Sequence, residues 1–443
     1  MGNIAQRLTF EGMKYAAIDP LLFIENRKKL ADSLPAASMA VLVSNDIMPS
    51  NADGSMGFKQ NSDLFYLSGV DQEETTLILF PGASNPAHRE ILFLRETNPH
   101  IAVWEGAKLT KEEAYSRTGV ATVMWNQDFK SVFRALMAEA ETVYLNRNEH
   151  IRAAAEVQTR EDRFMLRCKE EYPLHQYRRL APLLYRQRSI KHPIEIEQMR
   201  QACSITESGF RRLLSVVRPG IWEYEIEAEL WHEFIRLRSN GFAYTPIIAS
   251  GGSACVLHYT ENNRQCQSGD ALLLDIGADY ANYASDLTRV IPVSGSFSPR
   301  QLQVYNAVLR VQRHAIGLLR PGMTFSEYNA SVGLAMQEEL LELGLITSAE
   351  VRNQSSNAPA YKKYFMHGTS HFLGIDVHDV GYFHEPMQAG MVFTVEPGIY
   401  IPEEGIGVRL ENDILITENG IEDLMATIPI EAEEIQDLMR SGK

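Results

Sequence analysis

The sequence predicts two domains of different class, an α/β domain over residues 1–185 and an α+β domain over residues 186–443. Three observations lead to this division. The chain has 443 residues, which is too long for one ordinary domain. Strand-like and helical segments alternate through the first part. From Pro193 onward the order changes to pairs of long helices followed by strands, and this order occurs twice.

The first domain is predicted from short apolar runs that alternate with amphipathic stretches. Helices are expected at Pro20–Leu34, Thr110–Arg117 and Phe129–Glu141. Strands are expected at Ala40–Val43, Leu64–Leu67, Thr76–Phe80, Ile91–Leu94 and Val143–Leu145. Asn45–Gly57 is polar, contains Gly, Pro and Asn, and is predicted to be a loop. The alternation indicates one compact layered domain.

The second domain is predicted from two similar halves. Helices are expected at Pro193–Val217, Glu223–Arg238, Arg300–Leu319 and Ser326–Leu343. Strands are expected at Tyr244–Ala249, Leu272–Ile276, Thr288–Val293, Phe393–Val395 and Val408–Leu415. Arg-Pro-Gly follows the first helix of each pair, and the two copies lie 102 residues apart, with Glu225 and Glu327 at the same offset behind them. This predicts an internal αα-ββ repeat; the alternative is shared helix-stop chemistry, because Pro and Gly commonly end helices.

The composition excludes several classes of partner. Apolar residues make up 45% and charged residues 22%, which is typical of a globular protein with a large core. The net charge of −15 argues against binding to nucleic acid or to anionic membrane surfaces. No secretory signal or membrane-spanning run is visible. The four cysteines lack CxxC spacing, so free thiols in a reducing compartment, and a cytoplasmic protein, are expected.

Chemistry is first indicated within Leu272–Val290, which has strand-like ends and turn residues at Asp279–Asn282. If this hairpin folds about the Tyr280–Ala281 bond, Asp275 and Asp286 lie opposite each other. Opposed residues of an antiparallel pair share one face, with Cβ atoms about 5 Å apart. Two like charges there are destabilising unless a proton or a cation lies between them. The hairpin therefore predicts a metal site; solvated turn aspartates are the alternative.

Further histidines and acids follow toward the C-terminus. Pro397 favours an extended conformation for Glu396. Arg409 and Glu411 are two positions apart, so on a strand they share one face. Three histidines lie within twelve residues, at positions 367, 371 and 378. The first two would form an i, i+4 pair, but the Gly-Thr-Ser between them is poor helix, so spacing leaves open which histidine binds metal.

These motifs resemble a known family. LLLDIGADYANYASDLTR, HGTSHFLGIDVHDVG, TVEPGIY and GVRLEND are similar, in order and spacing, to the metal-binding segments of the pita-bread (creatinase/aminopeptidase) fold. LHYTEN, NSDLFYLSG and VWEGAKL resemble aminopeptidase P, also called Xaa-Pro aminopeptidase. The resemblance extends from Phe23 to Met439. It implies an aminopeptidase P-type N-terminal domain and a pita-bread catalytic domain that releases the N-terminal residue from peptides with proline in the second position.

The resemblance also implies roles for individual residues. The metal ligands would be Asp275, Asp286, His371, Glu396 and Glu411, with Asp286 and Glu411 bridging two divalent ions. The catalytic residues would be Glu396, as proton acceptor, with Arg409, His258, His367 and His378. The substrate-binding residues would be His258, His367, His378, Tyr244, Tyr400 and Trp104. Trp104 would lie near the pocket or reach a neighbouring subunit; a partly buried core tryptophan is the alternative.

The donor set constrains the cofactor. Four carboxylates balance two divalent ions, so such a site tolerates burial when it is occupied. Carboxylate oxygens with one imidazole suit Mn²⁺, and Zn²⁺, Co²⁺ and Fe²⁺ are the alternatives. Two adjacent ions would lower the pKa of a shared water and supply the hydroxide that attacks the peptide carbonyl. By analogy with the family, a homodimer or homotetramer is expected.

Other activities compete with this interpretation. A prolidase-like dipeptidase would use the same five ligands on free Xaa-Pro dipeptides. The loop after His378 is shorter than in some aminopeptidase P members and lacks their arginine, and Glu396–Glu411 is also compact, so the preferred peptide length stays open. Methionine aminopeptidases lack the large first domain. A non-catalytic peptide-binding module or a metal-free creatinase-like enzyme is the more distant alternative, because such relatives have lost ligands that are present here.

Overall fold

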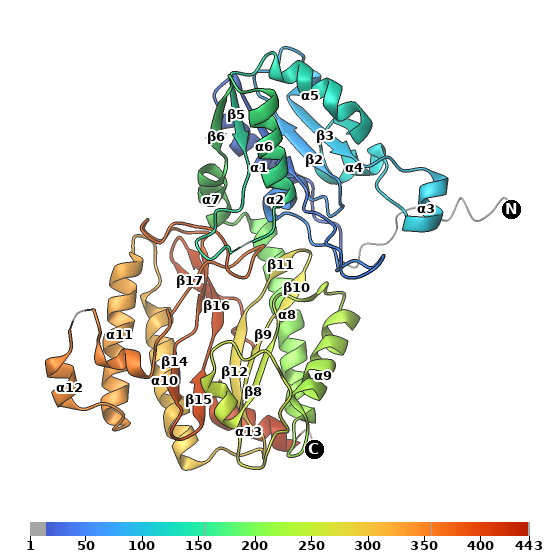
Figure 1. Ribbon diagram of the computed structural model, residues 1–443. Coiled ribbons are helices and arrows are strands. Elements are labelled where there is room, and N and C mark those ends of the chain that lie inside the picture. Colours follow the sequence, from blue (N-terminus) through green and yellow to red (C-terminus); the bar gives the residue numbers. More distant parts are fainter. Residues whose placement is uncertain (1–14, 155, 356, 442–443) are drawn as a thin grey trace. The chain divides into compact units, whose positions relative to one another are not determined.

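The structure of the chain is a computed structural model, and it describes residues 15–154, 156–355 and 357–441. The chain divides into two compact units, one ending at Arg188 and the other beginning at Ser189 (Figure 1). This division lies three residues after the boundary expected from the sequence. The first unit is α/β and the second is α+β, as predicted.

The N-terminal unit is built on one six-stranded sheet in the order β4-β3-β2-β1-β5-β6. Its strands are β1 (Ser38–Val43), β2 (Thr76–Leu79), β3 (Glu90–Leu94), β4 (Thr122–Trp125), β5 (Thr142–Leu145) and β6 (Gln176–Arg179). Strand β2 runs antiparallel to β1 and β3, and the other neighbouring pairs are parallel. The α-helices are α1 (Leu21–Asp32), α2 (Ser62–Ser68), α3 (Pro99–Glu105), α4 (Lys111–Thr118), α5 (Phe129–Met137), α6 (Arg160–Glu171) and α7 (Ala181–Ser189).

One predicted strand of this unit is wrong. Leu64–Leu67 lies in helix α2, which the sequence marks by its two ends. The Asn61 side chain accepts a hydrogen bond from the backbone N–H of Leu64 at 3.0 Å, and Gly69 ends the helix with a φ of 65°. A short apolar run that is buried on all sides does not distinguish a strand from a helix by periodicity, so the caps were the better signal.

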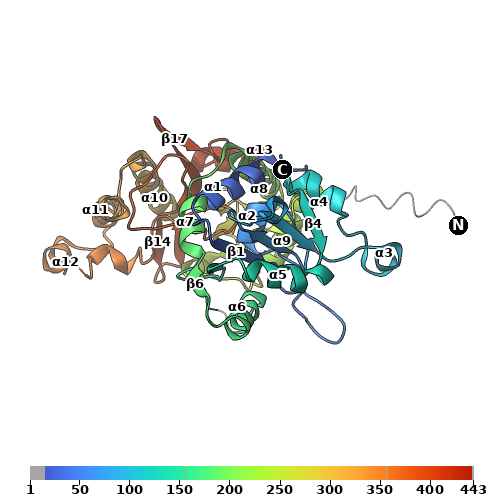
Figure 2. The ribbon, with the colours of Figure 1, turned by 90° about the horizontal axis from the view of Figure 1, so that it is seen from above.

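The C-terminal unit contains two helix pairs and several small sheets. Its α-helices are α8 (Pro193–Val216), α9 (Glu223–Arg236), α10 (Pro299–Leu318), α11 (Phe325–Glu342), α12 (Ser348–Asn353) and α13 (Ala432–Ser441). Its strands are β7 (Gly241–Phe242), β8 (Ile247–Ser250), β9 (Ala271–Ile276), β10 (Ala278–Tyr280), β11 (Tyr283–Ala284), β12 (Leu287–Pro292), β13 (Val392–Val395), β14 (Gly398–Ile401), β15 (Ile406–Arg409), β16 (Asn412–Thr417) and β17 (Gly420–Asp423). Helices α8 and α9 lie side by side, as do α10 and α11 (Figures 1 and 2).

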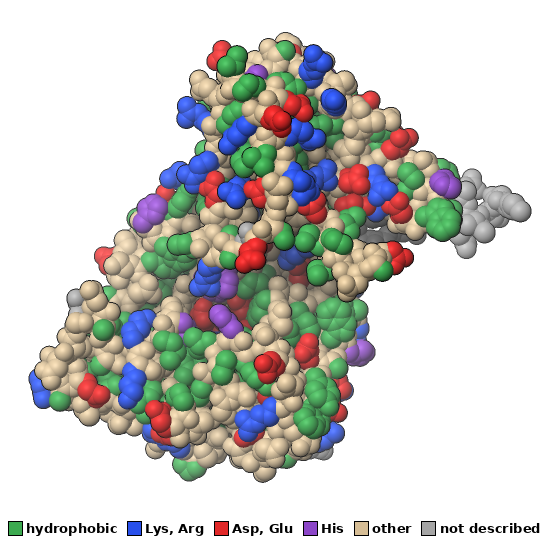
Figure 3. All heavy atoms as spheres, in the orientation of Figure 1, with side chains coloured by type: hydrophobic (Ala, Val, Ile, Leu, Met, Phe, Trp, Pro, Cys, Tyr) green, Lys and Arg blue, Asp and Glu red, His purple; other side chains and the backbone are tan. Residues whose placement is uncertain are grey.

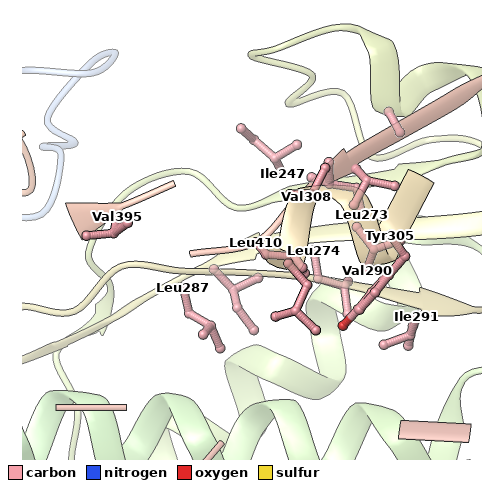
Figure 4. Packing of buried hydrophobic residues seen from close by; sticks show 14 of the residues in the cluster. Ile247, Leu273, Leu274, Leu287, Val290, Ile291, Tyr305, Val308, Val395 and Leu410 are labelled. Atoms are coloured by element: carbon pink, nitrogen blue, oxygen red, sulfur yellow. The ribbon is translucent and has the colours of Figure 1, made fainter. Parts of the chain in front are cut away.

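Apolar residues of the central strands and of helix α10 form the core of this unit. Figure 4 shows Leu273 and Leu274 of β9 and Val290 of β12 beside Tyr305 and Val308 of α10. All five side chains are almost completely buried. Strands β9 and β12, which carry two of the predicted ligand segments, are therefore fixed by packing, so the polar residues at their ends are held on a rigid support.

The predicted repeat is visible in the structure. Gly220 and Gly322 have φ values of 89° and 85°, which favour glycine. Their backbone N–H groups donate to Cys266 and Met387 carbonyls respectively, each at 2.8 Å. Glu225 and Glu327 each accept a hydrogen bond from the backbone N–H three residues earlier, at 2.8 and 3.0 Å. Helix-stop chemistry explains the glycine conformation, but it does not explain matching bonds to distant carbonyls, so the two halves are structural repeats.

Candidate metal centre

The first ligand hairpin forms with a register different from the predicted one. Strand β9 pairs Asp275 with Thr288, and not with Asp286. The turn lies one residue later than expected, at Ala281–Asn282, where φ values of 54° and 66° match a type I′ turn. The resulting two-residue shift keeps side chains on the same face. Asp275 and Asp286 still meet, because the Tyr244 hydroxyl lies 2.5 and 2.6 Å from their Oδ1 atoms.

The second ligand hairpin is interrupted where its two glutamates lie. Strands β13 and β16 pair up to Val395 and Asn412, and strands β14 and β15 resume the same register at Gly398 and Arg409. Glu396 and Glu411 fall in the gap between the two ladders, opposite each other. Pro397 has no backbone N–H for a ladder bond, which accounts for the interruption.

The predicted continuous strand Val408–Leu415 is therefore wrong, because β15 ends at Arg409 and β16 begins at Asn412. Arg409 and Glu411 nevertheless meet through a third side chain. The Thr288 hydroxyl accepts a hydrogen bond from Arg409 Nε at 3.1 Å and donates one to Glu411 Oε2 at 2.5 Å. Thr288 thus connects the two hairpins at the point where their acids converge.

His371 is the histidine whose free nitrogen points toward these acids. The segment around it is not helical, as the Gly-Thr-Ser between the two histidines led us to expect, so His367 and His371 do not form an i, i+4 pair on a helix. His371 Nδ1 lies 2.9 Å from the Phe372 carbonyl oxygen, which assigns the proton to Nδ1. Its Nε2 is 3.5 Å from Asp286 Oδ2 and 3.7 Å from Glu396 Oε1. The imidazole is therefore oriented as a ligand for an ion among the carboxylates.

The ligand atoms of Asp286, His371 and Glu411 all lie within 4.8 Å of one another, and all three residues are buried. Burial raises the pKa of Glu411 well above its usual range and that of Glu396 to about 7, and the neighbouring carboxylates add to both shifts. Burial also raises the pKa of Asp275. The Tyr244 hydroxyl has one proton and contacts two carboxyl groups, so the two acids share a single donor.

The chemistry of these residues fits a metal centre. Buried carboxyl groups that retain protons because of their neighbours are stabilised when a cation replaces those protons. Four carboxylates and one imidazole are donors that divalent ions of the Mn²⁺ type accept. The residues present therefore fit a site for divalent metal.

Arg409 supplies positive charge beside the acids. Its Nη2 donates to Asp275 Oδ2 and its Nη1 donates to the Tyr400 hydroxyl, at 2.5 and 2.9 Å. Tyr400 in turn lies 2.8 Å from His367 Nε2, and His367 Nδ1 lies 2.7 Å from the Gly368 carbonyl. Burial and the Arg409 guanidinium lower the pKa of His367 to about 4. His367 is therefore neutral, with Nδ1 as donor and Nε2 as acceptor.

The other two predicted histidines are exposed. The ring of His378 lies 4.4 Å from the ring of His371, edge to face. His258 lies near enough to His367 for its charge to lower the pKa of His367. On the C-terminal unit, Figure 3 shows histidine side chains gathered around recessed acidic side chains. The centre thus combines a buried acidic floor with histidines that solvent reaches.

Trp104 belongs to helix α3 of the N-terminal unit. Its side chain is 78% exposed, so the alternative of a partly buried core tryptophan is wrong. Among the described residues, helix α3 has none that is buried.

Sequence reasoning missed two residues of the centre. One is Thr288, which the assumed register placed away from Asp275. The other is Asp413, whose Oδ2 accepts hydrogen bonds from the backbone N–H of Asp286 at 3.0 Å and from the Cys203 thiol at 3.6 Å. Burial and the Asp286 carboxylate raise the pKa of Asp413 well above its usual range. The sequence signal that could have revealed Asp413 is its position as an acid at the start of an apolar strand segment.

Comparison with known proteins agrees with this geometry. Residues 197–418 match the model of metallopeptidase family M24, and residues 23–144 match the N-terminal domain of aminopeptidase P. The chain is 35% identical to the Xaa-Pro aminopeptidase of Haemophilus influenzae, over 94% of this chain and 96% of that protein. It is 33% identical to the Xaa-Pro aminopeptidase of Escherichia coli, over 95% and 98% of the two chains.

The chain belongs to the aminopeptidase P group of metallopeptidase family M24. Solved structures support the assignment. Zinc-substituted E. coli aminopeptidase P in complex with product is similar with a TM-score of 0.86 and 32% identity, over 97% of this chain and 100% of that chain. Pseudomonas aeruginosa aminopeptidase PepP gives a TM-score of 0.88 at 32% identity, over 96% and 99%. The predicted family and the predicted two-domain fold are confirmed. No helix in the described part of this M24 chain is long and apolar enough to cross a membrane.

Proposed function

We propose that the protein is an Xaa-Pro aminopeptidase, a dinuclear-metal hydrolase that releases the N-terminal residue from peptides with proline in the second position. One observation carries the proposal: two hairpins and a non-helical histidine segment bring four carboxyl groups together with the His371 ring nitrogen that points toward them. The full-length similarity to Xaa-Pro aminopeptidases supports the same activity.

Asp275, Asp286, His371, Glu396 and Glu411 would hold two divalent ions, with Asp286 and Glu411 between them. When bound, such ions acidify a water molecule and polarise a carbonyl group. The protein orients these ligands through side chains that are themselves fixed: Thr288 holds Glu411, Arg409 holds Asp275, and the Phe372 carbonyl holds the His371 ring. Such supporting contacts set both the geometry of a metal site and its affinity.

Glu396 is suited to proton transfer. Burial raises the pKa of Glu396 to about 7 in the metal-free protein, and bound ions would lower it, so the carboxylate would be available as a proton acceptor. The carboxyl group lies beside His371 and His367, at 3.7 and 3.8 Å from their nearest ring nitrogens. The nitrogen of an Xaa-Pro bond lies in a ring and carries no hydrogen, so cleavage requires delivery of a proton to it. We assign this delivery to Glu396.

The histidines then take different roles. His367 uses both ring nitrogens within the protein, so it orients Tyr400 and, through it, Arg409. His378 lies against His371 and is exposed, so we assign it the hydrogen bond to the developing oxyanion. His258 would contact the peptide, with Tyr244 and Tyr400 at the edge of the substrate site.

Four finer properties belong to the same proposal. Mn²⁺ is the metal that the carboxylate-rich donor set favours, ahead of Zn²⁺, Co²⁺ or Fe²⁺. A homodimer or homotetramer is inferred by analogy, and Trp104 would serve the substrate site from the N-terminal unit or from a neighbouring subunit. The four free cysteines are consistent with the reducing cytoplasm.

The decisive experiment compares two peptides. Enzyme stripped with a chelator is incubated with Gly-Pro-Gly or Gly-Pro, with and without Mn²⁺, and free glycine is measured. Metal-dependent release of glycine from the tripeptide is expected, and Glu396→Gln serves as the inactive control that retains the fold. Activity on the dipeptide alone would identify a prolidase. If the protein binds metal but cleaves neither peptide, the alternative of a non-catalytic peptide-binding module would be favoured.

A further inference from the structure

Glu223, outside the five predicted metal ligands, accepts four hydrogen bonds from the segment that carries His258. It is the first residue of α9, and its side chain is fully buried. Oε1 accepts hydrogen bonds from the Ser250 backbone N–H and hydroxyl at 2.8 and 2.7 Å. Oε2 accepts from the Tyr259 hydroxyl and the Arg264 backbone N–H at 2.8 and 2.9 Å. Four donors occupy the four acceptor positions of a carboxylate.

These donors all belong to the segment that carries His258. The segment leaves β8 after Ser250 and returns at Arg264, so Glu223 binds both of its ends and also Tyr259, the residue next to His258. Arg264 Nη1 also donates to the Ser250 carbonyl at 2.8 Å. One buried carboxylate therefore closes the loop and fixes its middle.

Asn262 anchors the same loop from the other side. Its side chain accepts a hydrogen bond from the Ile248 backbone N–H at 3.0 Å and donates to Glu227 and to the Pro246 carbonyl at 2.9 and 3.0 Å. Its φ of 46° is one that asparagine tolerates better than most residues. Together these bonds leave the loop backbone little freedom.

His258 itself has no such support. Within residues 15–154, 156–355 and 357–441, no group is hydrogen-bonded to the His258 ring. Its imidazole is exposed, whereas the loop beneath it is anchored. The position of the ring therefore depends on the backbone that Glu223 holds.

We propose that Glu223 is the positioning residue for His258, acting through Tyr259 and the two ends of the loop. This inference takes one assumption from the proposed function, which is that His258 contacts the substrate. Glu223→Gln puts an N–H donor where donors already point, so at least one of the four bonds is lost. Because bonds to a charged group are among the stronger ones, kcat/KM for Gly-Pro-Gly should fall about tenfold or more.

A double-mutant cycle separates positioning from general destabilisation. If Glu223 acts through His258, Glu223→Gln should lower kcat/KM by less than about twofold in a His258→Ala background, because the residue that it positions is gone. A full, multiplicative loss in that background would overturn the proposal. Glu225→Gln is the matched control, because Glu225 caps the same helix and, among the described residues, has no hydrogen bond to the loop. It should retain wild-type kcat/KM.

A second measurement does not depend on turnover. In protein labelled with ¹³C-histidine, the His258 ring resonance, assigned by its loss in His258→Ala, should move or broaden in Glu223→Gln and stay unchanged in Glu225→Gln. Tyr259→Phe removes only one of the four bonds and gives a milder variant if Glu223→Gln does not fold; it should shift the same resonance. An unchanged resonance in both loop variants would refute positioning. Unchanged activity in His258→Ala would instead refute the substrate role of His258.

Discussion

Thr288→Val tests how strongly the centre depends on a single hydroxyl. Thr288 is fully buried, and its Oγ1 lies 2.5 Å from Glu411 Oε2 and 3.1 Å from Arg409 Nε. Valine keeps the shape and removes both bonds. A hydrogen bond to a charged group contributes about 1.5–3 kcal/mol. In the metal-free protein burial raises the pKa of Glu411 and so disfavours its charged form, and the bond from Thr288 is worth most when bound metal favours the anion. A loss of about 2 kcal/mol corresponds to about thirtyfold weaker metal binding.

The assay is a Mn²⁺ titration in which free Mn²⁺ is followed by electron paramagnetic resonance. Thr288→Ser, which retains the hydroxyl and loses only the methyl group, is the matched control and should bind Mn²⁺ with near wild-type affinity. Thermal unfolding of each metal-free variant verifies the fold. Wild-type affinity in Thr288→Val, or equal weakening in both variants, would refute the argument that the hydroxyl supports Glu411.

Three further predictions follow from the same structure. Because burial raises the pKa of Glu411 and raises that of Glu396 to about 7, metal loading should release protons, seen by calorimetry as a binding enthalpy that depends on the buffer; no such dependence would contradict the assignment. Burial, together with the nearby Asp63 carboxylate, raises the pKa of Glu161 to about 7 in the folded protein. Folding therefore favours the neutral carboxyl group, and the free energy of unfolding should fall by up to about 3 kcal/mol as the pH rises from about 4.5 to 7. Glu161→Gln should flatten this fall when thermal midpoints are compared at about pH 5 and about pH 8, and an unchanged slope would exclude Glu161 as its source. Trp104→Ala should lower kcat/KM for Gly-Pro-Gly without moving the thermal midpoint, because the ring is 78% exposed; unchanged activity would remove Trp104 from the substrate site.

Several features of the fold could be predicted because their causes are local. The long helices of the C-terminal unit begin at sites such as His192-Pro193 and Ser298-Pro299, where capping residues and proline are adjacent in the chain. The repeat could be predicted because Arg-Pro-Gly occurs twice, each time with a capping glutamate five residues after its glycine. The α2 segment was misjudged as a strand because its apolar run is short, although Asn61 and Gly69 mark both helix ends.

The register of the hairpins could not be predicted to the residue. When the turn moves by one position, the residue opposite Asp275 changes from Asp286 to Thr288. The local sequence does not clearly favour one of these two turn positions over the other. The two hairpins also had to be docked on each other before Thr288 could meet Glu411. For the same reason Asp413 was not visible as a neighbour of Asp286.

The sequence by itself determined which donors are available, which family the chain belongs to and where most helices begin, because residue type, motif spacing and capping are properties of short stretches. Only the tertiary structure decided which donors meet. Thr288 and Glu411 are separated by 123 positions, and Asp286 and Asp413 by 127. Contacts over such distances depend on how the core packs the hairpins together, and the raised pKa values of the acids follow from that burial.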